Sequence, residues 1–287
     1  MRGFAHLLSS VGLETLLGNH AWFSQSLMRN QHAAAAFAQV GLESRGARIN
    51  WLLPLDHDGG DVLPPLLDNL SLESALRGSR CLLAAARADG ELFQHLRRAG
   101  FCIYGWQRFW QVFKDRFPDT RADAFSFNWC QPVAADSPEI SSLRRQLISP
   151  SMQTVKKITG EKLPQYILKI NGEIKGLAKI NPYGSKVMVT PLLAQTSYPH
   201  TLILQSLYAR LFTIYQIAYL VQTADMVGLE GTLTELADPV CDREELLVKH
   251  FTSMQKVPLA VLNSASPVRH ADTIAPMLKS DMPQDNL

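Results

Sequence analysis

SRCLLAAARADGELFQHLRRAGFCIY, residues 79–104, is the stretch that decides the fold of this chain. It opens with an apolar run from Cys81 that is typical of a buried strand. A charged segment of helical length follows, and Ala99-Gly-Phe then leads into a second apolar run that begins at Cys102. The stretch therefore predicts a strand, a short helix and a second strand, which is a unit of α/β folds.

Length and composition set the limits of the interpretation. The chain has 287 residues, of which 46% are hydrophobic and 19% charged. This is enough for two average domains with cores of their own, and it excludes wholesale disorder. A formal net charge of +2 gives no electrostatic reason to expect a nucleic acid or an anionic membrane as partner.

Cysteine usage and hydropathy indicate the compartment. Cys81, Cys102, Cys130 and Cys241 are widely spaced, without a CxxC pair, so we expect free thiols and neither a disulfide framework nor a metal site. We find no signal peptide, and polar residues interrupt the longest apolar stretch, 202–221, so we expect no membrane span. The prediction is a cytoplasmic protein.

The region before the opening stretch predicts mixed structure. Apolar residues between 4 and 28 have close to helical spacing, whereas 31–41 and 47–54 are interpreted as two antiparallel strands. A turn at 56–61 precedes a helix over 62–77, which carries prolines in its first turn and ends at a glycine.

A second series of elements begins after a charged segment without periodicity. Its clearest feature is a hairpin over 165–180, in which alternating apolar residues flank an Asn171-Gly172 turn of type I′. A strand at 125–132 and a helix over 136–147 precede this hairpin. The later elements are predicted in this order: a strand at 185–193, a helix at 199–211, a strand at 217–223, a short helix at 229–236 and a strand at 244–251.

The two series share one order of elements. Placing Phe101 on Val240 gives an offset of 139 residues, 240 minus 101, and this offset also aligns Leu96 with Glu235. We therefore predict a domain at 1–117, a linker at 118–124, a second domain at 125–254 and a tail at 255–287.

The order of elements and the Glu-Leu-Phe-Gln-His-Leu-Arg-Arg-Ala-Gly-Phe run resemble the GNAT fold of the N-acetyltransferases. The resemblance covers the chain up to about residue 254. It implies an α/β fold with mixed sheets and two GNAT-like domains in tandem, the first of them shortened at its N-terminus.

The resemblance also implies a site. In this family the fourth and fifth strands splay apart and acyl-CoA inserts between them. The loop after the fourth strand holds the pyrophosphate on its backbone N–H groups and on a helix N-terminus. The cofactor-binding positions implied here are Leu53, His57, Gly59 and Gly60 in the first half, and Leu192, Thr196 and Ser197 in the second.

Several of these positions depart from the family pattern. The first loop places three aspartates beside its glycines, and the second has no glycine and carries Pro199 near the start of its helix. Leu96 stands where the family keeps a tyrosine that protonates the departing thiolate. The remaining candidates for catalysis are Glu235, as an acid or base, and Tyr104.

Two functions stay open at this point. By resemblance, the chain transfers an acetyl or other acyl group from acetyl-CoA or another acyl-CoA to an unknown amine. Alternatively, both halves are catalytically inactive and form a module that binds a ligand or a partner protein, with oligomers possible. Fold alone does not decide between an enzyme and such a module.

Overall fold

A computed structural model of the chain describes 22–30, 33–54, 62–116, 127–159, 166–226 and 228–251. These residues all belong to one compact unit. The predicted linker and tail lie outside them. Within the described ranges, no helix is long and apolar enough to cross a membrane.

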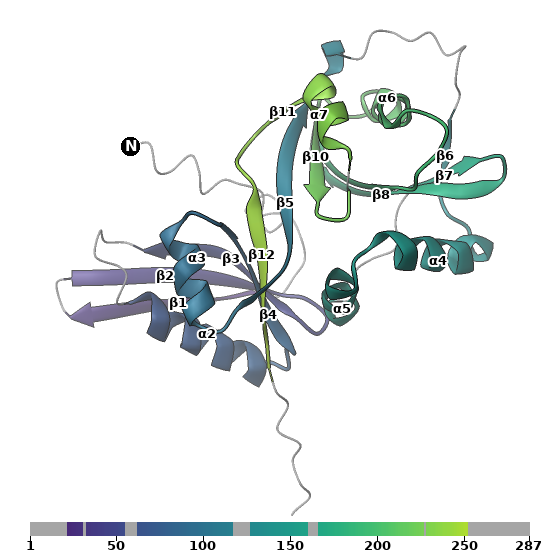
Figure 1. Ribbon diagram of the computed structural model, residues 1–287. Coiled ribbons are helices and arrows are strands. Elements are labelled where there is room, and N and C mark those ends of the chain that lie inside the picture. The colour runs from purple at the N-terminus through teal and green to yellow at the C-terminus, as the bar shows by residue number, and fades with distance from the viewer. Residues whose placement is uncertain are drawn as a thin grey trace, which may run out of the picture. The chain divides into compact units, whose positions relative to one another are not determined.

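The first half, residues 22–116, follows the predicted order from its second strand onward (Figure 1). Its main elements are β1 (Trp22–Asn30), β2 (Ala33–Leu42), β3 (Ala47–Pro54), α2 (Leu63–Leu76), β4 (Cys81–Arg87), α3 (Glu91–Arg98) and β5 (Cys102–Val112), with a 3-10 turn, η2, at Lys114–Arg116.

The helical expectation for 4–28 is wrong from Trp22 onward. Phe23 is buried while Trp22 and Ser24 are exposed, which is the alternation of a strand, and β1 pairs along its length with β2. The leucines that gave the helical spacing precede this strand, and they lie outside the described residues.

The second half, residues 127–251, repeats the order and adds two elements that were not predicted, α5 and β11. Its elements are β6 (Asn128–Cys130), η3 (Ala134–Asp136), α4 (Ser137–Leu147), α5 (Pro150–Thr159), β7 (Tyr166–Ile170), β8 (Glu173–Tyr183), β9 (Lys186–Leu193), α6 (His200–Leu211), β10 (Ile217–Thr223), α7 (Glu230–Leu236), β11 (Ala237–Pro239) and β12 (Glu244–His250). The hairpin turn is confirmed, because Asn171 and Gly172 have φ of 52° and 84°.

The strands of both halves form one mixed sheet. Its order is β1-β2-β3-β4-β12-β5-β10-β9-β8-β7-β6, and β11 pairs with β5. The last strand within the described residues, β12, is thus inserted between two strands of the first half (Figure 1). In return, β5 of the first half pairs with β10 of the second. Each half therefore completes the sheet of the other.

Helices cover the sheet in a repeated pattern. In the first half, α2 and α3 pack with β1–β4 and Leu247 of β12 around one apolar core. In the second half, α6 and α7 pack with β7–β10 and Trp110 of β5 around another. The helices α4 and α5 contact Leu177 and Leu246. These side chains alternate with Ala178 and Leu247, which belong to the first two cores, so α4 and α5 lie on the other face of the sheet. The chain is therefore an α/β fold in which one arrangement occurs twice in tandem.

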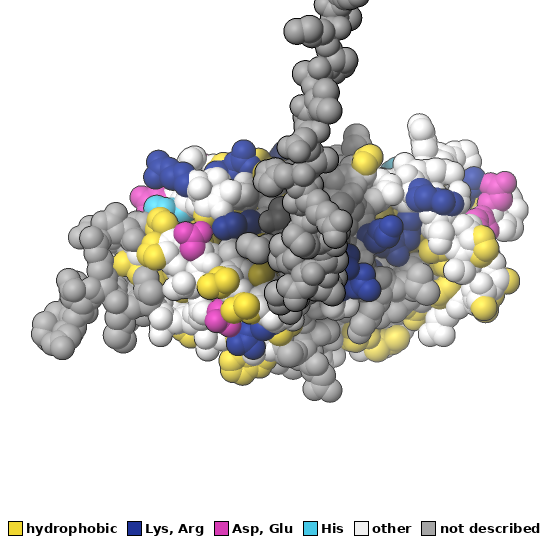
Figure 2. Space-filling model, turned by 90° about the horizontal axis from the view of Figure 1, so that it is seen from below, with side chains coloured by type: hydrophobic (Ala, Val, Ile, Leu, Met, Phe, Trp, Pro, Cys, Tyr) yellow, Lys and Arg dark blue, Asp and Glu magenta, His cyan; other side chains and the backbone are white. Residues whose placement is uncertain are grey.

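Charged side chains of both signs reach the surface. Figure 2 shows one face, on which Lys and Arg side chains, Asp and Glu side chains and apolar side chains are all present. This mixture agrees with the small net charge of +2.

Candidate functional site

The parallel strands β9 and β10 separate partway along their length. Their pairing runs from Lys186 with Ile217 to Val189 with Leu220 and stops there, although β9 continues to Leu193 and β10 to Thr223. The facing edges of the two strands beyond this point have no partner in each other. This is the splay that the resemblance implied for the second half.

The loop after β9 offers backbone donors at the open end of the splay. Two hydrogen bonds close a turn between Thr196 and Tyr198. The Thr196 hydroxyl accepts the Tyr198 N–H at 3.2 Å and donates to the Tyr198 carbonyl oxygen at 3.0 Å. No hydrogen bond within the described ranges uses the N–H of Thr196, Ser197, His200 or Thr201. Because α6 begins at His200, Pro199 precedes the helix and the first two helical N–H groups are kept.

The first half has a similar splay, and among its described residues the helix that follows offers fewer donors. Pairing of β3 with β4 stops at Arg48 with Leu83, although β3 continues to Pro54. However, Pro64 and Pro65 occupy the first turn of α2 and have no N–H, and Leu66 donates its own to the Val62 oxygen at 3.2 Å. The helix N-terminus there has little left to offer a phosphate.

Other implied residues of the first half are placed as follows. Leu53 is half-buried on β3, and Leu96 is fully buried in the core between α2, α3 and the sheet. His57, Gly59 and Gly60 lie outside the described residues. Leu96 thus fills a packing position.

Beside the second splay, the corner between α4 and α5 packs against side chains from three strands, β5, β9 and β12. We call Ile148–Ser149 the α4–α5 corner. Ile148 belongs to an apolar cluster that also contains Met152 and Leu246 and that Leu192 and Tyr104 pack against. Two sequence-predicted site residues, Leu192 and Tyr104, are therefore brought to one place, on the face opposite α6 and α7.

Tyr104 takes this position through an irregularity in its strand. The register of β5 with β12 shifts between Leu246, opposite Gly105, and Leu247, opposite Ile103, so Tyr104 is an extra residue. In a regular strand Tyr104 would share a face with Trp110, and the extra residue instead places the two side chains on opposite faces of the sheet. Its carbonyl oxygen accepts the Ser151 hydroxyl at 3.1 Å, which ties β5 to α5.

Asp225 is a site residue that the sequence reasoning missed. It lies two residues beyond β10, and one of its oxygens, Oδ1, accepts the Ser149 N–H at 2.9 Å. Its other oxygen, Oδ2, is buried and has no hydrogen-bond partner in the described structure. An orphaned buried acceptor costs about 1–3 kcal/mol, and more when charged. The available signal was the aspartate at the carboxyl end of a strand, where open α/β sheets bind ligands.

Glu235 is placed elsewhere. It is exposed on α7, whose buried side chains Leu233 and Leu236 join the core on the α6 side of the sheet. Val189 of β9 belongs to that core, whereas Leu192, three residues on, points to the other face. The structure does not bring Glu235 to the α4–α5 corner, and the catalytic roles of Glu235 and Tyr104 stay predictions.

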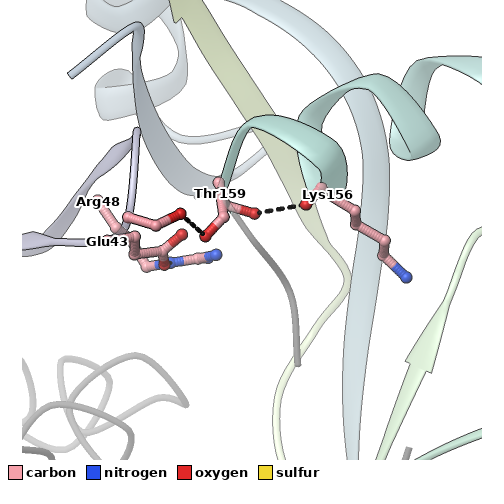
Figure 3. A network of polar contacts seen from close by, with 5 residues as sticks. Glu43, Arg48, Lys156 and Thr159 are labelled. Carbon is pink, nitrogen blue, oxygen red and sulfur yellow. Dashed lines mark hydrogen bonds and ion pairs between the residues drawn. The ribbon is translucent and has the colours of Figure 1, made fainter. Parts of the chain in front are cut away.

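Polar contacts fix the far end of α5 on the first half (Figure 3). The Ser44 hydroxyl donates to the Thr159 carbonyl oxygen at 2.8 Å, and Arg48 Nε donates to Glu43 at 3.0 Å beside it. Burial, and after it the Glu43 carboxylate, raise the pKa of the adjacent Cys81 thiol from 9.0 to about 11. This thiol stays protonated and belongs to the packing of α5.

Known proteins resemble the chain in structure and not in sequence. No protein-family model and no curated protein matches it. A conserved protein of unknown function from Staphylococcus epidermidis matches with 9% identity over 86% of this chain and 100% of its own, at a TM-score of 0.56. A GCN5-related N-acetyltransferase from Kribbella flavida matches with 12% identity over 88% of this chain and 98% of its own, at a TM-score of 0.54. A tandem GNAT protein from the clavulanic acid biosynthesis pathway matches with 9% identity over 84% of this chain and 87% of its own, at a TM-score of 0.43.

The match to the Kribbella flavida protein, together with the two splays and the repeated order of elements, shows that the chain has the GNAT fold.

Proposed function

We propose that this chain is an N-acyltransferase that takes an acyl group from acetyl-CoA or another acyl-CoA and transfers it to an amine. The acyl-CoA binds in the splay between β9 and β10. The observation that carries the proposal is the splay with its free donors, the N–H groups of Thr196, Ser197, His200 and Thr201, at the open end.

The arrangement of donors fits a pyrophosphate. Backbone N–H groups that precede a helix, together with the first N–H groups of that helix, form an anion site, and the helix dipole adds to it. Because the edges of β9 and β10 are unpaired in the splay, their backbone peptide groups are available to hydrogen-bond the amide-bearing arm of acyl-CoA. Leu192 and its neighbours at the α4–α5 corner then supply an apolar wall for the acyl group.

The first half supports this site and does not duplicate it. Its own helix N-terminus is depleted of donors by Pro64 and Pro65. It contributes β5, which pairs with β10 and carries Tyr104 to the α4–α5 corner. Because the halves exchange strands, we expect the site to require both of them.

A thermal-shift titration with acetyl-CoA tests the proposal. At one hundred times its dissociation constant the ligand adds about 2.7 kcal/mol, which for a chain of this size raises Tm by about 4–5 °C. Ser197→Glu, which puts a carboxylate among the donors, weakens this shift. Ser141→Glu, the same change at an exposed position of α4, leaves it intact. The absence of any shift with millimolar acetyl-CoA contradicts the proposal.

A further inference from the structure

Four neighbouring strands present half-exposed polar side chains on the face of the sheet that α4 and α5 flank. These strands are β8, β9, β10 and β5, in that order across the sheet. Their side chains on this face alternate with those of the α6 core, as Met188 does with Val187 and Val189. Five half-exposed polar residues among them, which we call the polar floor, are Lys179, Asn181, Thr190, Tyr219 and Gln111.

The polar floor begins where β9 and β10 separate. The last paired residues of the two strands are Val189 and Leu220, and Thr190 is the first residue of β9 beyond them. Lys179 of β8 is directly opposite Thr190, about 4.8 Å away across the sheet. Leu192, which contacts the acyl group in the proposed complex, follows on the same face. An acceptor that meets the thioester from this face therefore lies over the polar floor.

No described helix covers this part of the sheet. Its apolar side chains form a cluster of Phe109, Met188 and Val221, against which Tyr183, Tyr219 and Cys241 pack, and no residue of a described helix belongs to it. The helices α4 and α5 pack to either side, α4 against Leu177 and α5 against Leu246. Within the described part of the chain, the half-exposed floor is thus open to a ligand.

Lys179 is the one lysine of the hairpin β7–β8 that has no ionic partner in the described structure. Lys169 pairs with Asp136 at 2.8 Å, and Lys175 pairs with Glu173. Because β8 lies between β7 and β9, Lys179 does not protect an edge of the sheet. Its ammonium group is therefore a positive charge beside the splay without a carboxylate to balance it.

Other polar side chains of the floor are also unengaged. On β5, outside the floor, Gln107 donates to Glu244 at 3.0 Å. By contrast, no hydrogen bond between described residues uses the side chains of Asn181, Thr190 or Gln111. Asn181 and Thr190 flank Lys179, one on the same strand and one opposite. Together these three side chains offer an ammonium, an amide N–H₂ and a hydroxyl, all of which donate to anionic oxygens.

We propose that the polar floor binds the acceptor through an anionic group paired with Lys179, so that the substrate class is an amine that also carries a carboxylate or a phosphate. This inference rests on the proposed function. An ammonium and such an anion form a charge-assisted hydrogen bond, and the Thr190 hydroxyl and the Asn181 amide donate to the remaining oxygens. With the anion at Lys179 and the nitrogen at the splay, the two groups of the acceptor are about 5 Å apart, one strand spacing.

The test compares acceptors of matched length that differ in charge. 4-Aminobutyrate and O-phosphoethanolamine carry the two kinds of anion, whereas n-butylamine ends in a methyl group. Release of CoA thiol from acetyl-CoA gives kcat/KM for each at constant ionic strength. The wild type is expected to prefer at least one anionic acceptor over n-butylamine by about 10–100-fold, as for a hydrogen bond between charged groups. The preferred one identifies the anion, and equal values for all three contradict the inference.

Variants assign this preference to Lys179. Lys179→Met keeps the apolar stem and is expected to lower kcat/KM for the preferred anionic acceptor by the same factor, with a far smaller change for n-butylamine. Lys179→Arg keeps the charge and is expected to retain most of the preference. Lys175→Met, the same change on the same strand at a lysine that pairs with Glu173, leaves the preference intact. An equal loss with charged and uncharged acceptors makes Lys179 a structural residue and overturns the inference.

The proposed function and this inference fail in different ways. If acetyl-CoA gives no thermal shift, the proposed function fails. If acetyl-CoA binds but no acceptor is acetylated, or if it does not bind, 4-acetamidobutyrate and inorganic phosphate are titrated in thermal-shift experiments. Stabilisation of the wild type and of Lys175→Met, and not of Lys179→Met, supports the anion site. Identical curves for the three proteins contradict it.

Discussion

Leu247→Ala is expected to destabilise the first half of the sheet, although Leu247 is almost the last described residue of the second. Leu247 is fully buried on β12, opposite Ala84 of β4 and Ile103 of β5. It belongs to the core between α2, α3 and the sheet, which otherwise consists of residues from the first half.

The magnitude follows from burial. Replacing a buried leucine by alanine costs about 2–5 kcal/mol, and the larger values occur where the surroundings cannot collapse into the cavity. β12 is paired on both sides, so Leu247 lies in a part of the sheet that relaxes little. We expect about 3–4 kcal/mol, against a total stability of about 5–15 kcal/mol for a typical domain.

The assay is urea unfolding combined with native-state amide hydrogen exchange. The free energy of unfolding is expected to fall by the stated amount, and protection is expected to drop in β2 and β3, about two hundred residues earlier in the chain. Leu72→Ala is the control, because Leu72 is 59% exposed on α2, and it changes stability by less than about 0.5 kcal/mol. A loss below about 1 kcal/mol, or a loss of protection confined to β7–β10, would refute the assignment of β12 to the first core.

Two further predictions concern the junction of the halves. Trp110→Phe removes the buried hydrogen bond, 2.9 Å long, that the indole N–H donates to Gln222 Oε1, and it is expected to lower the free energy of unfolding by about 1–3 kcal/mol. In a double-mutant cycle, adding Gln222→Leu is expected to recover part of this lost stability. Burial raises the pKa of the Cys81 thiol from 9.0 to about 11 in the folded protein, so its contribution to stability is complete below pH 9 and is lost as the pH rises through 11. Relative to Cys81→Ala, the wild type is expected to lose about 2–3 kcal/mol across this range, and parallel pH profiles of the two proteins contradict this.

The elements with strong local signals were predicted from the sequence. β10 has the predicted bounds Ile217–Thr223, α6 begins one residue after the predicted start, and the Asn171-Gly172 turn has the expected positive φ at both residues. Each depends on neighbours in sequence: apolar periodicity, turn chemistry or a proline before a helix. The GNAT fold followed from the order of these elements.

Long-range pairing could not be predicted in the same way. The sequence of β12 does not indicate that its partners are β4 and β5, because a strand with this apolar pattern could pair with the edge of any other strand. Asp225 was missed for the same reason, since its contact with Ser149 joins residues 76 positions apart. α5 was missed because the sequence reasoning ended its helix at Leu147 and did not consider the residues that follow Pro150.

The insertion of β12 also bears on the synthesis of the protein. A ribosome that has made β5 still has residues 113–250 to add before the strand between β4 and β5 exists. At about 5–20 residues per second this takes roughly 7–28 s. Throughout that interval the nascent first half presents β4 as an open edge, which accepts any strand of suitable length. A second nascent chain on the same message is the nearest source of such a strand, so crowded translation favours swapped dimers joined through β12.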